Sequence, residues 1–498
     1  MPLIDTRMKN QLLRRLGVLL ALMATTGVNA QTENSAFSIT GKGVGVPFAT
    51  DYHALGINPS NLDWPSDFEG RVATFGVFEM GSSIYSEALG KEDLRNNLIP
   101  TTFDKLTDEE KLDVVKNFTE SSIAIDVDIM PVGFHMNTQN AGGFAFMIRD
   151  RVDYFSNFGP LVAEIGVLGY QADYWQEWIL TSGDTIPAGT EIPDGEAIEQ
   201  GYTPQDNALL VSEILDGSTL SMQWTREYQI GYGKKVYSTD DYAIYGGVGL
   251  KYISGTAFLQ IDGRDGKATA FSAMSPFFEI DYGPETAANP TALPLDSTSL
   301  IPKPVGQGFG VDLGMSILLK DKFRFGISLT DLGSITWDGN VHAFNDLQFT
   351  EIGNGGIETL SIIESVSNLT GSEGILEWQG SQSIKSKLPT TVRVGAGLLL
   401  NKKLRVGGEA IIPVNNDLVN YDKAILGVGG DFAPVPWIQL SAGFLTGGNY
   451  DFKVPAGITF QVANGAWEAG VASRDIITFF SENQPTISAS FGFLRFRV

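Results

Sequence analysis

The stretch "TLSMQWTREYQIGYGK", residues 219–234, alternates large apolar side chains with small or polar ones at a period of two. Its apolar face runs from Leu220 to Tyr232 and carries a single charge, Arg226. The other face is made of Gly, Ser, Thr, Gln and Glu. This period predicts a β-strand between two different environments. The stretch exceeds the roughly 5 or 6 residues of an ordinary strand and suffices for the about 9–11 residues that cross a membrane at a tilt.

The same alternation recurs after residue 70 and defines fifteen candidate strands: 71–85, 123–129, 142–155, 219–234, 241–262, 267–282, 308–319, 322–337, 392–398, 403–413, 422–433, 436–446, 455–463, 465–475 and 485–497. One face of these strands suits lipid, and the other suits a packed or wet lumen. In lipid the sheet must close, because an open edge leaves backbone groups unpaired. The sequence therefore predicts an all-β fold, a transmembrane antiparallel β-barrel of about 14 strands within a range of about 12–16, since bacterial barrels usually have even strand numbers. A soluble β-protein with one buried face is the alternative.

The amino terminus has the pattern of a secretory signal peptide. A basic head is followed by an apolar run from Leu16 to Met23, and Val28-Asn29-Ala30 offers small residues for cleavage. The run is shorter than the about 20 residues of a spanning helix. We therefore assign residues 1–30 to a signal peptide and expect the mature chain in the bacterial outer membrane.

Composition excludes several function classes. Without residues 1–30, 30 Lys and Arg stand against 57 Asp and Glu, a balance of −27 that does not suit nucleic acid. There is no cysteine, and the three histidines, His53, His135 and His342, are far apart in sequence. Motifs such as G-x-S-x-G, S-x-x-K and H-E-x-x-H are absent. We expect no enzyme, no catalytic residues, no cofactor and no metal site.

Outside the strands, the segment "LTDEEKLDVVKNF" predicts a helix that begins with a capping box of Thr107 and Glu110. A second short helix is expected within Leu161 to Trp175. Long loops are expected near 157–217, 283–306 and 339–388, facing the cell exterior as in other membrane barrels. The glycines of 41–45 and 427–430 resemble fragments of phosphate loops, but we interpret them as positions where two backbones approach closely.

Period two also places charges on the small-residue face, at Asp126, Asp128, Arg149, Arg151, Glu227, Lys251, Asp312, Arg324, Arg393, Arg405, Glu409, Asp431 and Glu468. They could neutralise one another as ion pairs, which a low dielectric favours, or orient the polar head of a ligand. Arg393, Arg405 and Glu409 lie on neighbouring predicted strands. An anionic head group would find two guanidinium groups there, so this trio is the candidate ligand site.

The mature start, "GKGVGVPFATDYHALGINPSNLDWP", resembles the amino-terminal segment of FadL-like outer-membrane channels, in which an Asn-Pro turn precedes the barrel. The segments "GVGLKYISG", "GFGVDLGMSI" and "LPTTVRVGAGLLL" resemble parts of the same superfamily, which includes PorV-type barrels. The chain looks most similar to uncharacterised Bacteroidetes barrels with a helix after the first strand. The resemblance implies a plug, or hatch, of residues 31–70 before a barrel of 71–498, with Asn58-Pro59 as the plug turn. A periplasmic lead-in is the alternative.

Two functions follow as expectations. The first is a passive channel for hydrophobic or amphipathic small molecules, carried by the plug and an apolar-lined lumen. The second is a PorV-like partner barrel for secretion or surface attachment of proteins, which would need an exposed apolar patch near Leu161 to Trp178. Expected partners are outer-membrane lipid, the barrel-assembly machinery, and a hydrophobic ligand or a secreted protein. The alternation of "FLRFRV" up to Val498 resembles the terminal signal that this machinery reads, although that signal usually ends in an aromatic residue.

Overall fold

The structure is a computed structural model of the 498-residue chain. It describes residues 36–86, 106–120, 122–138, 140–264, 266–280, 282, 289–294, 302–320, 322–356, 375–401, 403–415, 423–448, 450–480 and 486–498. The predicted signal peptide, residues 1–30, and the first residues of the predicted plug, 31–35, lie outside the described residues. So does most of the predicted loop 283–306 and the middle of the loop 339–388.

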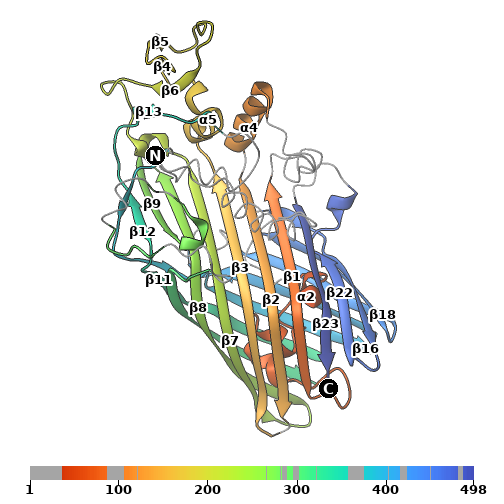
Figure 1. Cartoon of the computed structure of the whole chain (residues 1–498). Helices are drawn as coiled ribbons and strands as arrows, with labels where there is room; N and C mark the ends of the chain where they lie inside the picture. The colour runs from red at the N-terminus through yellow and green to blue at the C-terminus, as the bar shows by residue number, and fades with distance from the viewer. Residues whose placement is uncertain are drawn as a thin grey trace.

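Fourteen antiparallel strands form a closed barrel (Figure 1). In wall order they are β1 (Ala73–Ser86), β2 (Ile123–Thr138), β3 (Gly142–Asn157), β7 (Thr219–Ser238), β8 (Tyr242–Arg264), β10 (Gly306–Leu319), β11 (Phe323–Trp337), β16 (Thr391–Asn401), β17 (Leu404–Pro413), β18 (Ile425–Val435), β19 (Ile438–Gly447), β21 (Ala456–Val462), β22 (Trp467–Ser473) and β23 (Thr486–Arg497). The last strand pairs with the first, from Thr74↔Arg497 to Tyr85↔Thr486, and this pairing closes the wall. The predicted barrel and its strand number are confirmed.

One of the fifteen candidate strands, 267–282, is wrong as a wall strand. Its described core is β9 (Lys267–Met274), which pairs with the far half of β8 and then with β12 (Val341–Phe344) beyond the barrel. β10 takes the neighbouring place in the wall instead, along β8 from Tyr242 to Gly255. Alternation recognises a paired strand with one buried face, and β9 has both properties without facing lipid.

The barrel has two different ends. Short turns join β2 to β3, β7 to β8, β10 to β11, β16 to β17, β18 to β19 and β21 to β22, and the carboxyl terminus lies at the same end (Figure 1). We call it the short-turn end; in membrane barrels it faces the periplasm. All long connections emerge at the opposite, long-loop end.

The outward face of the wall is apolar and exposed. Phe309 is 70% exposed and Val428 is 58% exposed, and the same face carries Phe75, Phe325 and Phe460. Large apolar side chains exposed all round a closed sheet fit a lipid environment. The one charge expected on this face, Arg226, donates two hydrogen bonds to the carboxylate of Asp150 on the neighbouring strand, at 2.7 and 2.8 Å. No helix among the described residues has the length and apolar character needed to cross a membrane.

Two residues with a left-handed backbone break the alternation of β1 and β11. Phe78 in β1 has a φ of 52°, and Asp331 in β11 has a φ of 57°. Both lie in the left-handed region that side chains other than Gly rarely adopt. Each marks a β-bulge, after which the inward and outward faces of the strand exchange. In β2 the pairing with β3 also shifts by one residue, between Ile129 and Val132.

The long-loop end carries a second, smaller sheet and most of the helices (Figure 1). The sheet has the order β13 (Glu351–Ile352), β6 (Ile198–Tyr202), β4 (Glu177–Leu180), β5 (Thr185–Pro187). The other elements of this end are α4 (Asp108–Glu120), α5 (Pro160–Leu168), η3 (Gly169–Gln171), α6 (Val211–Ile214), η4 (Pro276–Phe278), β14 (Trp378–Gly380), β15 (Ile384–Lys387), β20 (Tyr450–Lys453) and η6 (Ile477–Phe479). Their core is a buried cluster that includes Trp175, Phe349 and Trp378.

Both helices predicted from the sequence are present. In α4, Thr107 Oγ1 accepts a hydrogen bond from Glu110 N at 3.3 Å, and Thr107 N donates to Glu110 Oε2 at 2.7 Å, which confirms the capping box. The second predicted helix, within 161–175, is α5 and ends earlier than expected.

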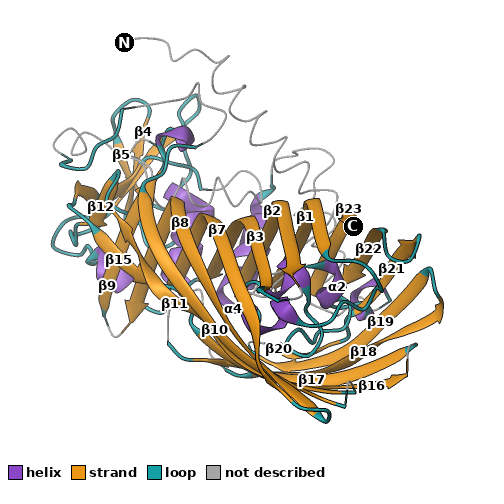
Figure 2. Ribbon diagram, turned by 90° about the horizontal axis from the view of Figure 1, so that it is seen from below, coloured by secondary structure: helices purple, strands orange, loops and turns teal. Residues whose placement is uncertain are grey.

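An amino-terminal segment lies inside the barrel, where Figure 2 shows its short helices within the ring of strands. We call residues 36–67 the inner segment. It contains α2 (Phe37–Thr40), η1 (Asp51–Ala54) and η2 (Pro59–Asp63). A 14-stranded wall is too wide for its own side chains to fill, and the segment occupies that space with a buried cluster that includes Tyr52, Leu55 and Leu62.

Inward glycines of the wall let the inner segment approach. A Cβ on Gly429 of β18 would collide with the carbonyl oxygen of Lys42, and one on Gly143 of β3 would collide with that of Leu62. The glycine-rich stretches 41–45 and 427–430 are therefore neighbours in space. Their interpretation as places of close backbone approach is confirmed, because a side chain has no room between the two backbones.

Candidate functional site

A cavity of about 890 Å³ opens at the short-turn end, between the inner segment and the wall. Asp67, Phe68 and Trp64 line it from the amino-terminal side, and Arg405 and Arg497 line it from the wall. Its volume lies within the about 300–1,000 Å³ that ligand sites usually have. We call this cavity the vestibule.

On one side of the vestibule, β22 and β23 hold the inner segment through a buried ion network. Arg495 donates to Asp51 Oδ2 at 2.5 Å and also pairs with Glu468. Arg497 pairs with Glu468 Oε2 at 2.9 Å. The Arg495 guanidinium also lies over the ring of Tyr52, 5.3 Å from its centroid. A buried charge is tolerated only when it is paired in this way.

A second contact joins the segment to β1. The Tyr52 hydroxyl donates to Glu79 Oε1 at 2.6 Å, and His53 Nε2 lies 2.6 Å from Glu79 Oε2. The other ring nitrogen of His53 lies 2.9 Å from Ser38 Oγ. Glu79 points inward because it follows the bulge at Phe78. One carboxylate of the wall therefore binds two side chains of η1.

The structure brings two of the three candidate ligand residues into direct contact. Arg393 NH1 donates to Glu409 Oε1 at 3.3 Å. Glu409 Oε2 accepts hydrogen bonds from the backbone N–H groups of Gly45 and Val46, the latter at 3.0 Å. Glu409 thus fixes the backbone of the inner segment to β17, as a carboxylate can when it accepts several backbone donors.

Arg405, the third candidate, takes part in a different group at the vestibule. Its guanidinium pairs with Asp67 at 2.6 Å and with Asp431 at 3.1 Å. Asp431 also accepts from Lys42 Nζ at 2.6 Å and from Ser441 Oγ at 2.6 Å. Both arginines are therefore ion-paired in this structure, and ligand binding by the trio stays a prediction.

Asp67 closes this group at the end of the inner segment. Arg324 pairs with it at 3.2 Å, in addition to Arg405. Burial by itself would raise the pKa of Asp67, but the two guanidinium groups outweigh it and hold that pKa at about 2. About a third of the side chain, 34%, is still exposed to the vestibule. Asp67 is the ion-paired residue at which the segment leaves the lumen for β1.

The predicted plug turn, Asn58-Pro59, lies deep in the lumen. Asn58 Oδ1 accepts from Ser60 N at 3.1 Å and from Ser60 Oγ at 2.7 Å, so it caps η2. Ser60 Oγ in turn lies 2.8 Å from Ser316 Oγ of β10, which also accepts from Trp64 Nε1 at 2.9 Å. Gly314 lies directly opposite, where a Cβ would collide with Asn58 Oδ1. The turn is a contact between the inner segment and β10.

These contacts form one charge group, which we call the segment network. It contains six carboxylates and six cations, together with His53: Asp51, Asp67, Glu79, Glu409, Asp431, Glu468, Lys42, Arg324, Arg393, Arg405, Arg495 and Arg497. Its formal charges cancel. The inner segment contributes three of these charged groups, and the wall contributes nine.

A second charge group lies further toward the long-loop end and comes from the wall alone. We call it the acidic band; it consists of Asp126, Asp128, Asp153, Glu227, Asp312, Asp331, Arg149, Arg151 and Lys251. Gly56 of the inner segment faces it, because a Cβ there would lie 3.9 Å from Arg149 NH1 and from Lys251 Nζ. Six carboxylates meet three cations here, so the band does not balance.

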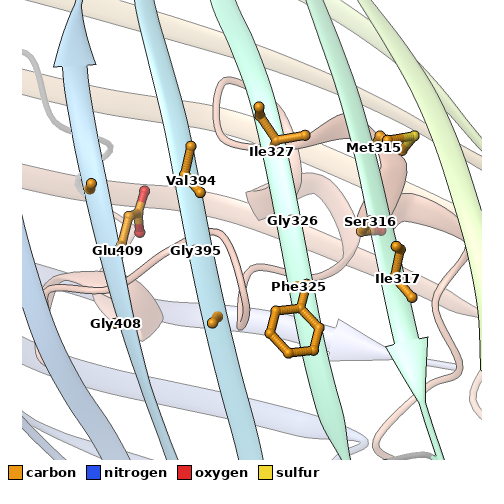
Figure 3. Close-up of a pocket in the computed structure, with 12 residues that line it drawn as sticks. Met315, Ser316, Ile317, Phe325, Gly326, Ile327, Val394, Gly395, Gly408 and Glu409 are labelled. Atoms are coloured by element: carbon orange, nitrogen blue, oxygen red, sulfur yellow. The ribbon is translucent and has the colours of Figure 1, made fainter.

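A second hollow, of about 510 Å³, lies on the outer face of β10, β11, β16 and β17 (Figure 3). Met315, Ile327, Phe325 and Val394 stand around it, and Gly408 leaves its floor open. It belongs to the apolar outer surface, and the inner segment lies behind the wall (Figure 3). We interpret it as a groove for lipid chains, since it offers almost no polar group.

No group of three or more His, Asp or Glu side chains within the described residues has the arrangement of a metal site. The carboxylates of the segment network are instead engaged by Arg, Lys, Tyr52, His53 or backbone N–H groups.

Comparison with known proteins gives a family and a set of similar structures. A family model described as a family of unknown function (DUF5723) matches residues 199–464, more than half of the 498-residue chain. The chain belongs to this family. The matched part of this DUF5723 chain begins within β6 and ends in the turn after β21, so the inner segment and β1–β5 lie before it. None of the curated proteins compared with the sequence matches it.

Among solved structures, the toluene transporter TodX of Pseudomonas putida matches with a TM-score of 0.42 and 10% identity, over 94% of this chain and 98% of that one. A Pseudomonas aeruginosa FadL homologue matches with a TM-score of 0.39 and 11% identity, over 94% and 99%. The toluene transporter TbuX of Ralstonia pickettii matches with a TM-score of 0.41 and 9% identity, over 93% and 98%. One of these three structures is a FadL homologue, of the family whose amino-terminal segment the sequence resembles.

Sequence reasoning missed several members of the site in this DUF5723 chain. Glu79 and Asp331 were missed because each lies at or just after a bulge, where the parity of the strand changes. Asp51, Lys42 and Asp67 were missed because nothing local tells which wall residue they meet. Arg495 and Arg497 could have been found, because they alternate with Leu494 and Phe496 in the last strand.

Proposed function

We propose that this protein is a passive outer-membrane channel for amphipathic small molecules and that the inner segment is its plug. The observation that carries the proposal is how the segment is held. The backbone-to-backbone hydrogen bonds of described residues 36–64 are all internal to the segment, from Ile39→Ala36 to Trp64→Asn61. The contacts to the wall are made by side chains. A segment outside the ladder can move while the barrel stays closed.

The residues that line the lumen indicate which class of molecule the proposed channel passes. The lining of the described wall is mixed and not uniformly apolar: many inward residues are Gly, Ser, Thr and charged groups such as Arg149, Lys251 and Glu409, and apolar residues such as Met147 and Ile411 stand among them. Apolar side chains gather instead at the long-loop end, around Trp175 and Phe349. A molecule that passes both regions needs an apolar part and a polar head. This supports amphipathic rather than purely hydrophobic ligands.

The alternative function, a PorV-like partner barrel, is not favoured. It needed an exposed apolar patch between Leu161 and Trp178. In this segment Val162, Ile165 and Trp175 are buried in the core of the long-loop end. Such a surface offers little for docking a secreted protein.

Export and insertion belong to the same proposal. Residues 1–30 would direct export, residues 31–70 would form the complete plug, and the terminal strand would be read by the barrel-assembly machinery. The position of β23 between β22 and β1 agrees with such a role, because closure of the wall needs it. A Bacteroidetes origin stays a prediction.

A reversible lock tests the plug. Ser60 Oγ of the segment and Ser316 Oγ of β10 lie 2.8 Å apart, and the chain has no cysteine, so Ser60→Cys with Ser316→Cys places one disulfide across plug and wall. The measurement is entry into proteoliposomes of an amphipathic dye whose charged head does not cross lipid. We expect flux in the oxidised protein to fall about tenfold or more, and to recover on reduction, because the plug cannot leave a covalent anchor.

The matched control is a lock within the wall. Thr330 and Thr391, on β11 and β16, have hydroxyl oxygens 2.9 Å apart, and the pair Thr330→Cys with Thr391→Cys leaves the plug free. Its flux should not depend on oxidation. Equal flux in the oxidised and reduced forms of the plug lock would contradict a moving plug.

A further inference from the structure

Each cation of the acidic band is already paired with at least one carboxylate. Arg149 binds Asp128 through two hydrogen bonds, at 2.7 and 2.5 Å. Lys251 is shared between Asp312, at 3.1 Å, and Asp331, at 2.5 Å. The carboxylates of the band therefore outnumber the cations that can neutralise them.

Arg151 shows the same sharing at the outer edge of the band. It pairs with Glu227 at 3.1 Å and reaches Asp153 only at 3.9 Å. Asp153 lies directly opposite Asp126 in the register of β3 and β2, and both side chains are more than nine-tenths buried. Like charges at opposite positions of a strand pair destabilise the sheet.

Asp126 has unused hydrogen-bonding capacity. Its Oδ2 is buried and has no hydrogen-bond partner among the residues that the structure describes. Arg474, beyond the band, acts on Asp126 electrostatically, together with Asp153 and Asp128. Even with Arg474 counted, six carboxylates stand against four cations. An excess of buried carboxylate in a low dielectric calls for a proton or a bound cation.

The unsatisfied groups of the two charge regions differ in kind. Within the described part of the chain, the unsatisfied atom of the acidic band is an acceptor, Asp126 Oδ2, and a second unsatisfied acceptor, Gln229 Oε1, belongs to a neighbour that donates to Glu227. In the segment network they are guanidinium N–H donors of Arg324, Arg393 and Arg495. Because only the band has spare acceptors, only the band is suited to a ligand that donates hydrogen bonds and carries positive charge.

We propose that the carboxylate pair Asp126–Asp153 binds the protonated amino head group of an amphipathic molecule. The inference rests on the proposed function, since the head group reaches the band through the lumen, and it names the substrate class as cationic amphiphiles. An ammonium group supplies up to three donors and one charge. It satisfies Asp126 Oδ2 and relieves the repulsion between the two carboxylates.

The test is binding to the full mature protein in a non-ionic detergent at pH 7, read as the shift of the thermal unfolding midpoint. The probes share one tail and differ in the head: dodecylammonium, dodecanoate and dodecanol. We expect dodecylammonium to raise the midpoint and the other two to leave it unchanged. In the Asp126→Asn/Asp153→Asn double variant the affinity for dodecylammonium should fall about 10–100-fold, the effect of losing a charge-assisted hydrogen bond.

The unliganded double variant gives a second readout. Its midpoint should equal or exceed that of the native protein, because the substitution removes repulsion and keeps the size of both side chains. Glu199→Gln, an exposed acid of β6, is the matched control and should leave the dodecylammonium shift intact. A dodecylammonium shift that survives in the double variant would overturn the site.

Two further outcomes would overturn the proposal in distinct ways. If ammonium or potassium chloride alone gives the same Asp126-dependent shift, the site takes a free cation and not a head group. If no cation shifts the midpoint between pH 6 and pH 9, the carboxylates share a proton.

The dye-flux lock of Ser60 and Ser316 separates this inference from the proposed function. If oxidation of the Ser60/Ser316 lock lowers the dye flux but dodecylammonium does not bind, the proposed head-group site is refuted and the proposed channel is retained. Binding without any effect of the lock refutes the moving plug and keeps the site.

Discussion

The segment network and the acidic band occupy the same lumen but reach opposite charge states. In the segment network the wall supplies five cations and four carboxylates, and the inner segment adds Lys42, Asp51 and Asp67, which brings the balance to zero. In the acidic band all groups come from the wall, and six carboxylates meet three cations. The difference indicates that each region of the wall carries a net charge that a separate group neutralises. In the first region the partner is a part of the same chain, and in the second the partner is a ligand.

The largest expected effect breaks the segment network at Glu409. In Glu409→Gln the charge that holds Arg393 and the N–H groups of Gly45 and Val46 is lost while the size is kept. Breaking a buried ion pair costs about 3–5 kcal/mol. We expect that loss in the free energy of unfolding, measured by urea titration in lipid bilayers, together with dye flux above the native level.

An exposed pair provides the control for this variant. Asp241 and Lys320 lie 3.5 Å apart with most of both side chains exposed, so Asp241→Asn should change the stability by less than about 1 kcal/mol. A similar loss in both variants would mean that Glu409 has no special role in holding the segment.

A smaller effect is expected from steric displacement of the segment, which leaves every charge in place. In Gly429→Ala the new Cβ meets the carbonyl oxygen of Lys42, and overpacking of this kind costs about 1–3 kcal/mol. We expect the segment to shift, Lys42 to separate from Asp431, and dye flux to rise. Gly246→Ala in β8 is the matched control, because its Cβ would meet only the Val236 side chain, at 3.4 Å. Unchanged flux in Gly429→Ala would show that the backbones of the inner segment and the wall are not in close contact at this position.

The smallest effect concerns Asp67 and pH. Its pKa is held at about 2 in the folded protein, below its usual 3.8, so the ion pairs to Arg324 and Arg405 stabilise the seated segment fully above pH 4. This contribution is lost as the pH falls from about 4 to about 2. We expect dye flux to rise in that window, and Asp67→Asn to show the raised flux already at neutral pH. The idea fails if the variant and the native protein respond identically between pH 4 and pH 2.

The strands of the wall could be predicted from the sequence because the alternation of apolar and small or polar residues is a local pattern. Alternation identified the barrel and its strands, and it placed Arg393, Glu409 and Asp431 on the inward face. It could not exclude 267–282, because β9 obeys the same rule against β8 beyond the membrane. The alternation also could not predict which face the residues after Phe78 occupy, because the left-handed backbone of Phe78 turns Glu79 inward.

The inner network was not predictable from local pattern. Asp51 meets Arg495 and Lys42 meets Asp431 across hundreds of residues of sequence, and these pairings depend on how the segment folds inside the closed wall. The Asn58-Pro59 step indicated a turn but not its depth or its contact with β10. The resemblance to FadL-like channels, and not the period of two, supplied the idea of a plug.

The strands of the wall have very unequal lengths, from 23 residues in β8 to seven in β22. Seven residues span roughly 23 Å even without tilt, less than the roughly 25 Å of an outer-membrane apolar band. The barrel therefore imposes a hydrophobic mismatch on one side only. Lipid beside β22 has to thin, or the barrel axis has to lean away from the membrane normal. With either response the surroundings of the barrel differ from one side to the other in the membrane plane. Neighbouring proteins and lipids therefore meet a short wall near β22 and a tall wall near β8.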